Sequence, residues 1–348
     1  MRRSFDSRAP EAAANLEALP SLTTPGARQV LSRADIAVVI PCLNEELTIA
    51  AVVTSYRKEL PDARVFVFDN CSTDRTAEEA RRAGATVVAA TRPGKGHVVQ
   101  AMFREVDSDI YVMVDGDGTY PSHAVHSLIA PVVRGHADMV VGSRLLAGTE
   151  SQFRFINRWG NLFFLWLVRV VFGVKITDML SGYRAFNRRF VKRLPLLGGG
   201  FETETELTIK ALDRGFRIQE VPVSLVPRPE GSFSKIRIGG DGLRIVGMIF
   251  GMLRDYKPFT FFGGLGVLCM VFGLIPGAIV VVEFLETRFI THVPSAILAV
   301  GFELTGLVLI AIGLILHTVV RHSQELNVRL QLMTDELIAN AARRSPIQ

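Results

Sequence analysis

Two carboxylates stand two residues apart at the end of an apolar run in the middle of the chain. The run 110–114 leads directly into Asp115, Gly116 and Asp117. Carboxylate oxygens suit hard divalent cations, and Mg²⁺ commonly bridges one or two carboxylates and the phosphates of a substrate. Such a cation neutralises a diphosphate leaving group. The pair therefore predicts a Mg²⁺ or Mn²⁺ site at Asp115 and Asp117, although Asp and Gly are also common in ordinary turns.

Other short apolar runs also end at residues that could bind a ligand. These are Pro41, Leu43, Asn44 and Glu45 after the first run, Asp69 at the second, Lys95 after the third and Arg144 after the fifth. In open α/β sheets, ligands bind outside the carboxyl ends of the strands. We therefore expect these residues to converge on one crevice, although they lie far apart in the sequence.

The elements that must position these residues alternate between short β-branched runs and helical stretches. Strands are expected at 36–40, 65–69, 86–90, 110–115 and 139–144, with helices at 45–58, 74–83, 96–106 and 122–133. This alternation predicts an α/β fold with a parallel sheet. After residue 144 we expect an apolar helix at 156–172, an edge strand at 181–186, a helix at 202–214 and a strand at 218–226. Pro222 places the last strand at an edge or a bulge.

Taken together, the strand-end motifs resemble the nucleotide-sugar-binding half of family-2 glycosyltransferases. The resemblance implies the GT-A fold, a Rossmann-like domain with a mostly parallel sheet. Motifs at 157–161, 177–184, 202–206 and 228–235 look like those of the dolichyl-phosphate mannose synthase group and related polyprenyl-phosphate glycosyltransferases. The resemblance covers about residues 36–240.

The resemblance implies a role for each matched residue. Nucleotide-sugar binding falls to Pro41, Leu43, Asn44, Glu45, Asp69, Lys95, Gly116, Arg228 and Lys235, while Asp115 and Asp117 bind metal and diphosphate. Arg144 and Arg158 are the expected partners of an acceptor phosphate. Two positions depart from the family pattern: Asn70 stands where many relatives have a second aspartate, and Leu43 replaces an aromatic residue common in the mannose synthases. Because of the second departure, the motif does not distinguish a guanine from a uracil base in the donor nucleotide.

A polyprenyl phosphate acceptor explains why charged residues are abundant and no general base stands out. Such a monoester carries about −1.5 to −2 charge near neutral pH and is already a nucleophile. A metal ion and arginines would reduce its repulsion by the nucleotide diphosphate. We expect an inverting transfer that gives a lipid-linked sugar donor. The favoured nucleotide-sugar is a UDP-sugar, and GDP-mannose is the second choice.

The sequence is also compatible with two alternative functions. A processive polysaccharide synthase usually carries a Gln-x-x-Arg-Trp motif and more membrane spans, whereas Arg158-Trp159 here is preceded by other residues. A non-catalytic membrane scaffold that binds nucleotide-sugar or lipid would keep the fold, yet all the charged residues expected for catalysis are present.

Two apolar stretches near the carboxyl terminus predict a transmembrane helical hairpin. The first, 259–282, contains no Asp, Glu, Lys or Arg, and the second, 293–320, has only Glu303 and His317 as ionisable residues. Each is long enough to cross a bilayer. Arginines and lysines flank the outer ends of both stretches, so the positive-inside bias places the catalytic domain and both termini in the cytoplasm. Glu303 is a candidate functional residue, near the headgroups or facing a neighbouring subunit.

These observations divide the chain into five parts. They are an N-terminal extension, expected to be flexible, at 1–34, a catalytic domain at 35–232, an acceptor loop with an interfacial amphipathic helix at 233–257, the hairpin at 258–321 and a cytoplasmic tail at 322–348. The net charge of +5 is concentrated near 228–257, which favours anionic lipid over nucleic acid as the partner. Three cysteines without metal-ligand spacing indicate a reducing compartment. The resemblance and the hairpin together suggest a homo-oligomer.

Overall fold

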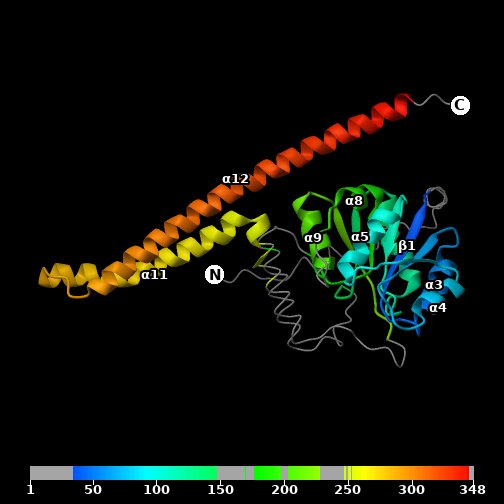
Figure 1. The fold of residues 1–348 in the computed structure, drawn as a ribbon, viewed down its shortest axis with the longest axis horizontal. Coiled ribbons are helices and arrows are strands. Elements are labelled where there is room, and N and C mark those ends of the chain that lie inside the picture. Colours follow the sequence, from blue (N-terminus) through cyan, green and yellow to red (C-terminus); the bar gives the residue numbers. More distant parts are fainter. Residues whose placement is uncertain are drawn as a thin grey trace, which may run out of the picture. The chain divides into compact units, whose positions relative to one another are not determined.

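The computed structural model describes residues 34–146, 169, 176–196, 203–227, 247, 250–251 and 253–344. The chain forms two compact units, Met1–Arg237 and Ile238–Gln348, and each is described by itself (Figure 1). The predicted extension at 1–34, the apolar helix at 156–172 and the amphipathic helix at 239–256 lie wholly or largely outside the described residues.

A seven-stranded sheet forms the centre of the described part of the first unit, in the order β3-β2-β1-β4-β6-β5-β7. Its strands are β1 (Ile36–Cys42), β2 (Arg64–Asp69), β3 (Thr86–Ala89), β4 (Ile110–Met113), β5 (Met139–Ser143), β6 (Arg184–Asn187) and β7 (Ile218–Pro222). Only β6 runs antiparallel to its neighbours, β4 and β5. The mostly parallel α/β sheet expected from the sequence is therefore confirmed.

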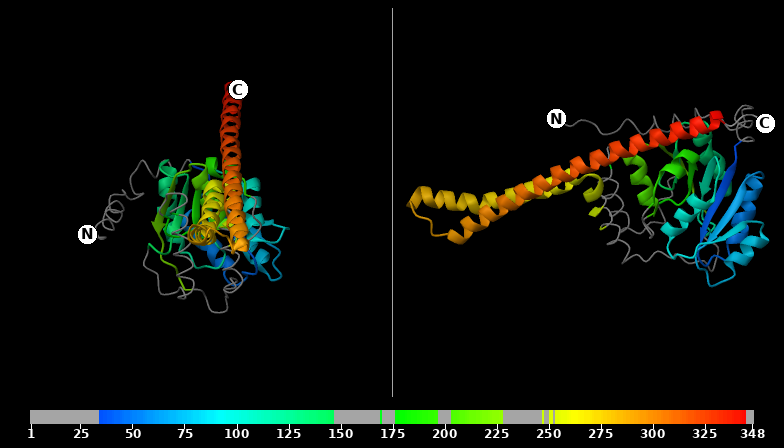
Figure 2. Two further views of the ribbon diagram at one scale, coloured as in Figure 1. Left: turned by 90° about the vertical axis from the view of Figure 1, so that its left-hand side faces the viewer. Right: turned by 45° about the horizontal axis from the view of Figure 1, so that its top comes forward.

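Helices cover both faces of this sheet (Figures 1 and 2). They are α3 (Ile49–Glu59), α4 (Thr76–Arg82), α5 (Lys95–Glu105), η1 (Ser122–Ala124), α6 (Val125–Val133), α8 (Arg188–Arg193) and α9 (Thr203–Asp213). One apolar core packs α3 and α6 against one face, and a second packs α5, α8 and α9 against the other. The alternating side chains of β1 supply both cores, since Val38 and Ile40 belong to the first and Ala37 and Val39 to the second.

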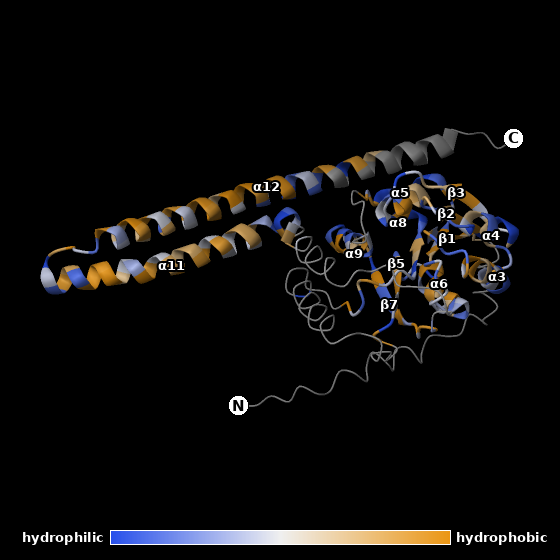
Figure 3. Ribbon diagram, turned by 60° about the horizontal axis from the view of Figure 1, so that its bottom comes forward, coloured by the Kyte–Doolittle hydropathy of each residue, from blue (hydrophilic) through white to orange (hydrophobic). Residues whose placement is uncertain are grey.

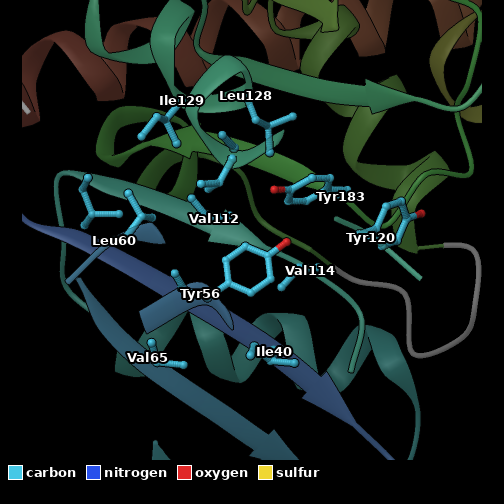
Figure 4. Packing of buried hydrophobic residues seen from close by; sticks show 14 of the residues in the cluster. Ile40, Tyr56, Leu60, Val65, Val112, Val114, Tyr120, Leu128, Ile129 and Tyr183 are labelled. Carbon is cyan, nitrogen blue, oxygen red and sulfur yellow. The ribbon is translucent and has the colours of Figure 1, made fainter. Parts of the chain in front are cut away.

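The first core also contains tyrosines from three different parts of the chain. Tyr56 on α3 meets Tyr183 edge to face, with 6.3 Å between the ring centroids, and Tyr120 lies 5.2 Å from Tyr183 by the same measure (Figure 4). Tyr120 lies in the segment that follows β4, and Tyr183 directly precedes β6. Aromatic packing therefore joins the segment after β4 to the start of β6.

One predicted strand occupies a different place from the one expected. The run 181–186 was expected at an edge, but β6 lies inside the sheet between β4 and β5. A short apolar run reveals that a strand is buried, but it does not reveal how many neighbours pair with it. The expectation for Pro222 is confirmed, since β7 forms an edge and ends at this proline.

The second unit contains two long helices, α11 (Pro258–Thr287) and α12 (Val293–Arg344). Both are long and apolar enough to cross a membrane. In each helix, only 17% of an apolar stretch of 18 residues is buried inside the protein. Orange, apolar residues run along most of both helices in Figure 3. Core helices of a soluble protein would instead be mostly buried. Helix α12 continues beyond its apolar part, so the predicted tail at 322–348 is helical as far as Arg344.

Glycines bring α11 and α12 into backbone contact. A Cβ on Gly306 would lie 2.7 Å from the carbonyl oxygen of Gly266, and a Cβ on Gly266 would lie 2.7 Å from that of Gly306. A carboxylate oxygen of Glu303 lies 3.1 Å from the position of a Cβ on Gly273. Within this chain, Glu303 therefore packs against α11 at one of its glycines.

Candidate active site

The loops that follow β1 and β2 are joined by hydrogen bonds between backbone and side chains. The backbone N–H of Asn44 donates to Ser72 Oγ at 2.9 Å, and that of Thr73 donates to Asn44 Oδ1 at 2.8 Å. Glu45 N–H donates to Thr76 Oγ1 at 2.8 Å. Asn44 has a φ of 51°, a left-handed conformation that asparagine tolerates better than most residues. The two loops and the strand ends before them thus form one wall, which contains the predicted residues Pro41, Leu43, Asn44, Glu45 and Asp69.

Asn70 connects this wall to the loop that directly precedes Lys95, the first residue of α5. Its side-chain amide donates to the carbonyl oxygens of Ala90 and Arg92, at 3.0 and 2.8 Å, and its Oδ1 accepts from Gly94 N–H at 2.8 Å. The side chain is buried, with 6% of its surface exposed. An ionised aspartate has no donor for the two carbonyls. The departure from the family pattern at Asn70 therefore has a structural role in this chain.

The Asp-x-Asp loop lies close against the end of β1. Thr48 Oγ1 donates to the carbonyl oxygen of Gly116 at 2.7 Å. A Cβ at Gly116 would lie only 2.6 Å from Cys42 Sγ, so a larger residue would force the Cys42 side chain or the loop to shift. Asp117 is buried, and its Oδ1 accepts from Thr119 N–H and Oγ1 at 3.1 and 2.7 Å. The first bond joins this loop to the segment that follows β1, and the last two orient the Asp117 carboxylate.

Asp115 shares a lysine with a carboxylate from a distant helix. Lys95 Nζ lies 2.6 Å from Asp115 Oδ1 and 2.5 Å from Oε1 of Glu204, which is on the first turn of α9. The lysine side chain is 18% exposed and that of Glu204 6%. Burial opposes the charge on Lys95, but the two carboxylates outweigh it and raise its pKa. Lys95 therefore stays protonated between them.

The other oxygen of Asp115 lies against Gly182. A Cβ on this glycine would overlap Asp115 Oδ2. The N–H of Gly182 donates to the hydroxyl of Tyr120 at 3.1 Å, and burial raises the pKa of that tyrosine. Asp115 is consequently held on two sides, by a lysine at one oxygen and by close packing at the other.

Arg144 extends from the end of β5 and pairs with Asp178. Its Nε and Nη2 donate to the two carboxylate oxygens at 2.7 and 2.8 Å. Burial would raise the pKa of Asp178, but the Arg144 guanidinium holds it below its ordinary value. Glu220 on β7 accepts from the N–H groups of Thr177 and Asp178, which fixes the Asp178 loop. The pair fixes the orientation of the guanidinium at the edge where the other strand-end residues lie.

The predicted site residues at the carboxyl ends of β1, β2, β4 and β5 are thus brought to one edge of the sheet. Arg158, Arg228 and Lys235 lie outside the described residues, and their expected roles stay predictions. Sequence reasoning assigned no role to Thr48, Asp178, Gly182 or Glu204. The motifs at 177–184 and 202–206 gave the available signal for the last three, but their partners lie on other elements and could not be identified from spacing.

The carboxylates fit a divalent cation that shares its ligands with a substrate. Within the described ranges, no group of three or more His, Cys, Asp or Glu side chains is placed to hold a metal ion. Asp115 and Asp117 offer hard oxygen ligands, and Mg²⁺-type sites are often completed by substrate phosphates and water. Both residues could therefore hold a cation together with a diphosphate.

Comparisons with known proteins agree with this fold. The family model for glycosyl transferase family 2 matches residues 37–194. Glycosyltransferase AglJ of Haloferax volcanii is 32% identical over 281 residues, covering 80% of this chain and 92% of that protein. A dolichyl-phosphate hexose transferase of the same organism is 32% identical over 189 residues, covering 54% of this chain and 82% of that protein.

Among solved structures, the chain resembles glucosyl-3-phosphoglycerate synthase from Mycobacterium tuberculosis in complex with Mn²⁺, UDP-glucose and phosphoglyceric acid. The TM-score is 0.53 at 25% identity, over 66% of this chain and 83% of the other. The family match falls on most of the strands and loops that assemble the site, and the similarity to AglJ extends over most of both proteins. This chain is therefore a glycosyltransferase that belongs to glycosyl transferase family 2.

Proposed function

We propose that the protein transfers one hexosyl group from a nucleotide-sugar, in first place a UDP-sugar, onto a polyprenyl phosphate. The observation that carries the proposal is the set of charges at one sheet edge: two loop carboxylates, Asp115 and Asp117, with the oriented guanidinium of Arg144. This arrangement suits a reaction in which one phosphate-bearing molecule must approach another.

The apolar surface at the same edge supports a lipid acceptor. Within the described part of 34–227, every exposed large apolar side chain belongs to a loop at the carboxyl edge of the parallel strands: Leu43, Leu47, Leu146, Leu180 and Val226. The N–H of Val226 donates to the carbonyl oxygen of Thr119, just after the Asp-x-Asp loop. A prenyl chain can bury apolar area against these loops, which supplies affinity without specific hydrogen bonds. The name of the dolichyl-phosphate hexose transferase relative points to the same acceptor class.

On the donor side, the residues of this chain bind and orient the nucleotide-sugar. The wall that contains Pro41, Leu43, Asn44, Glu45 and Asp69 would hold the base and ribose. Asp115, Gly116 and Asp117 would hold the diphosphate together with Mg²⁺ or Mn²⁺, which supplies charge neutralisation for the leaving group. The UDP-glucose and Mn²⁺ in the glucosyl-3-phosphoglycerate synthase complex favour a UDP-sugar over GDP-mannose for this chain.

On the acceptor side, the residues position a nucleophile that is already ionised. The phosphate monoester needs no base to remove a proton, so Arg144 and Arg158 serve to bind it and to fix its line of attack. Arg228 and Lys235 complete the positive surface that surrounds donor and acceptor phosphates. In-line displacement by the phosphate oxygen inverts the anomeric centre, and the product is a sugar linked to lipid through one phosphate.

The two apolar helices provide the membrane context of this reaction. We place 258–321 across the cytoplasmic membrane as a hairpin, 233–257 at its surface as acceptor loop and amphipathic helix, and the catalytic domain 35–232 in the cytoplasm with both termini. The positive residues that flank the hairpin support this orientation. The lipid-linked sugar would form at the cytoplasmic face.

The acceptor class is tested by comparing acceptors that differ in one chemical feature. Full-length protein in detergent, with Mn²⁺ and UDP-glucose or UDP-glucuronic acid, is given undecaprenyl phosphate, undecaprenol or 3-phosphoglycerate, and UDP release is measured. Release that depends on undecaprenyl phosphate alone supports the proposal. Release with 3-phosphoglycerate instead would assign a soluble phosphorylated acceptor, and release with undecaprenol would remove the argument from acceptor charge.

Measuring donor binding and product length with the same protein and substrates separates the two alternative functions of this chain. Donor binding without transfer to any acceptor, over a panel of UDP- and GDP-sugars, would favour a non-catalytic scaffold. Products that grow by many sugars would favour a processive polysaccharide synthase.

A further inference from the structure

Lys95 lies between two carboxylates that come from different elements of the fold. Asp115 follows β4, and Glu204 lies on the first turn of α9. The backbone directly before the lysine is also fixed, because the N–H of Gly94 donates to the Asn70 side chain. The lysine headgroup therefore has a fixed position and two anionic partners within 2.6 Å.

This arrangement has a consequence for any cation that approaches Asp115. A lysine ammonium and a divalent metal are both cations that favour the same carboxylate oxygen, so Lys95 competes with a metal at Asp115 Oδ1. An enclosed ammonium that loses its only counter-ion is strongly disfavoured. Lys95 does not face this loss, because Glu204 lies 2.5 Å from its ammonium and can keep it paired when Asp115 binds a cation.

We propose that Glu204 is a positioning residue that retains Lys95 and thereby releases Asp115 for the metal ion and diphosphate of the donor. Asp115 touches the ligand, Lys95 restrains Asp115, and Glu204 decides how strongly. The inference deepens the proposed function, since it rests on a cation-assisted donor site at Asp115 and Asp117. It also assigns a role to one acidic residue of the motif at 202–206.

The chain offers a matched control on the same helix. Glu206 forms an ion pair with Lys210 at 2.6 Å, and both side chains are 7% exposed. This pair resembles Lys95–Glu204 in chemistry and burial, but it adjoins Pro195, whose carbonyl oxygen accepts from Lys210. Glu206→Gln therefore removes a buried carboxylate from α9 without changing the partners of Lys95.

The test is a double-mutant cycle on Mn²⁺ binding to the full-length protein in detergent. Free Mn²⁺ is titrated by electron paramagnetic resonance, with neither donor nor acceptor present, in wild type, E204Q, K95M, E204Q/K95M and E206Q. We expect E204Q to raise the Kd for Mn²⁺ about tenfold, because Lys95 then holds Asp115 alone. K95M should lower the Kd, and E204Q should change it less than about twofold in the K95M background.

Three results would overturn the inference. They are an unchanged Kd in E204Q, an equal rise in E206Q, and a rise from E204Q that persists in the K95M background. Circular dichroism of each variant checks that the fold is retained. If E204Q is poorly folded, K95M still tests the inference, because it should lower the Kd for Mn²⁺ and an unchanged or raised Kd would contradict it. Because the titration needs no transfer, a failed transfer assay with an intact cycle would refute the proposed function and leave this inference standing.

A kinetic readout adds to the binding cycle once a donor is known. E204Q should raise the Mn²⁺ concentration for half-maximal activity while kcat at saturating Mn²⁺ falls less. A purely structural role for Glu204 would lower the amount of active protein and leave that concentration unchanged.

Discussion

Arg144 shows how a charged residue is oriented before any ligand binds. The sequence placed this arginine at the end of a strand, and the structure adds Asp178, which receives two of its hydrogen bonds. A second pair, Arg217 with Asp138, lies at the start of β5, and Asp138 also has a lowered pKa. The two aspartates are similarly buried, so they can be compared directly.

Replacing Asp178 with Asn should impair acceptor use as well as stability. Asp178→Asn leaves Arg144 without its orienting carboxylate, and we expect kcat/KM for undecaprenyl phosphate to fall about tenfold or more. Asp138→Asn should lower the thermal unfolding temperature while kcat/KM changes less than about twofold. Steady-state kinetics and thermal unfolding of both variants check this. Equal kinetic losses would show that Asp178 acts only through stability.

The lowered pKa of Asp178 also predicts a pH dependence of stability. The unfolded state has a pKa near 3.9 and the folded state a lower one, so the contribution of the ionised group is complete above about pH 4 to 5. It is lost as pH falls through the folded pKa. Thermal unfolding temperatures between about pH 2 and 5 should therefore fall less steeply in Asp178→Asn than in wild type. Parallel curves would contradict this assignment.

Gly182 provides a residue-scale test of how Asp115 is held. A methyl group at this position would overlap Asp115 Oδ2, and that carboxylate must move. We expect Gly182→Ala to lower kcat/KM for the nucleotide-sugar about tenfold or more, measured under initial-rate conditions. Ala185, which is buried in the adjacent strand β6, serves as a control when changed to Gly. That variant should lose stability and retain the donor KM.

At the scale of elements, periodicity predicted the alternating half of the sheet well. Strands buried on both faces, such as β1, read as continuous apolar runs, and polar residues mark their carboxyl ends. The interior position of β6 was missed because pairing partners depend on the crossover from β5, which local sequence does not encode. The contacts of Lys95 with Asp115 and Glu204 were missed for the same reason, since each residue comes from a different element.

The helical hairpin depends on glycines at the contact between α11 and α12. Leu at Gly306 would collide with the backbone of α11, whereas nothing lies within 4 Å of a Cβ at Gly301 on the same helix. We expect Gly306→Leu to destabilise the hairpin by about 1–3 kcal/mol and Gly301→Leu to have a much smaller effect. Thermal unfolding followed by the helical circular dichroism signal in detergent compares the two. Equal losses would contradict the observed packing.

At the scale of the whole molecule, composition alone predicted where the apolar helices lie, and length and composition of α11 and α12 agree. Their orientation in a membrane is still a prediction, which flanking charge supports. Cys71 is exposed in the catalytic unit and can report its side of the membrane. The turn between the helices contains Arg288, which can be changed to cysteine for the same purpose.

Cysteine labelling should place the two reporters on opposite sides. In intact cells, a membrane-impermeant thiol reagent should modify R288C and leave Cys71 unmodified until the cells are lysed. The natural Cys71 in wild type provides the control for leakage. Modification of Cys71 in intact cells would indicate the opposite orientation. Protection of R288C both before and after lysis would argue against an exposed turn.

The most direct test of the central claim is the mass of the lipid after reaction. Wild-type protein is incubated with Mn²⁺, a UDP-hexose panel and undecaprenyl phosphate, and the lipid fraction is analysed by mass spectrometry, with Asp117→Asn as the inactive control. We predict undecaprenyl phosphate that has gained one hexosyl residue and no additional phosphate, formed by wild type alone. Lipid of unchanged mass with every donor, or a sugar diphosphate product, would contradict the account.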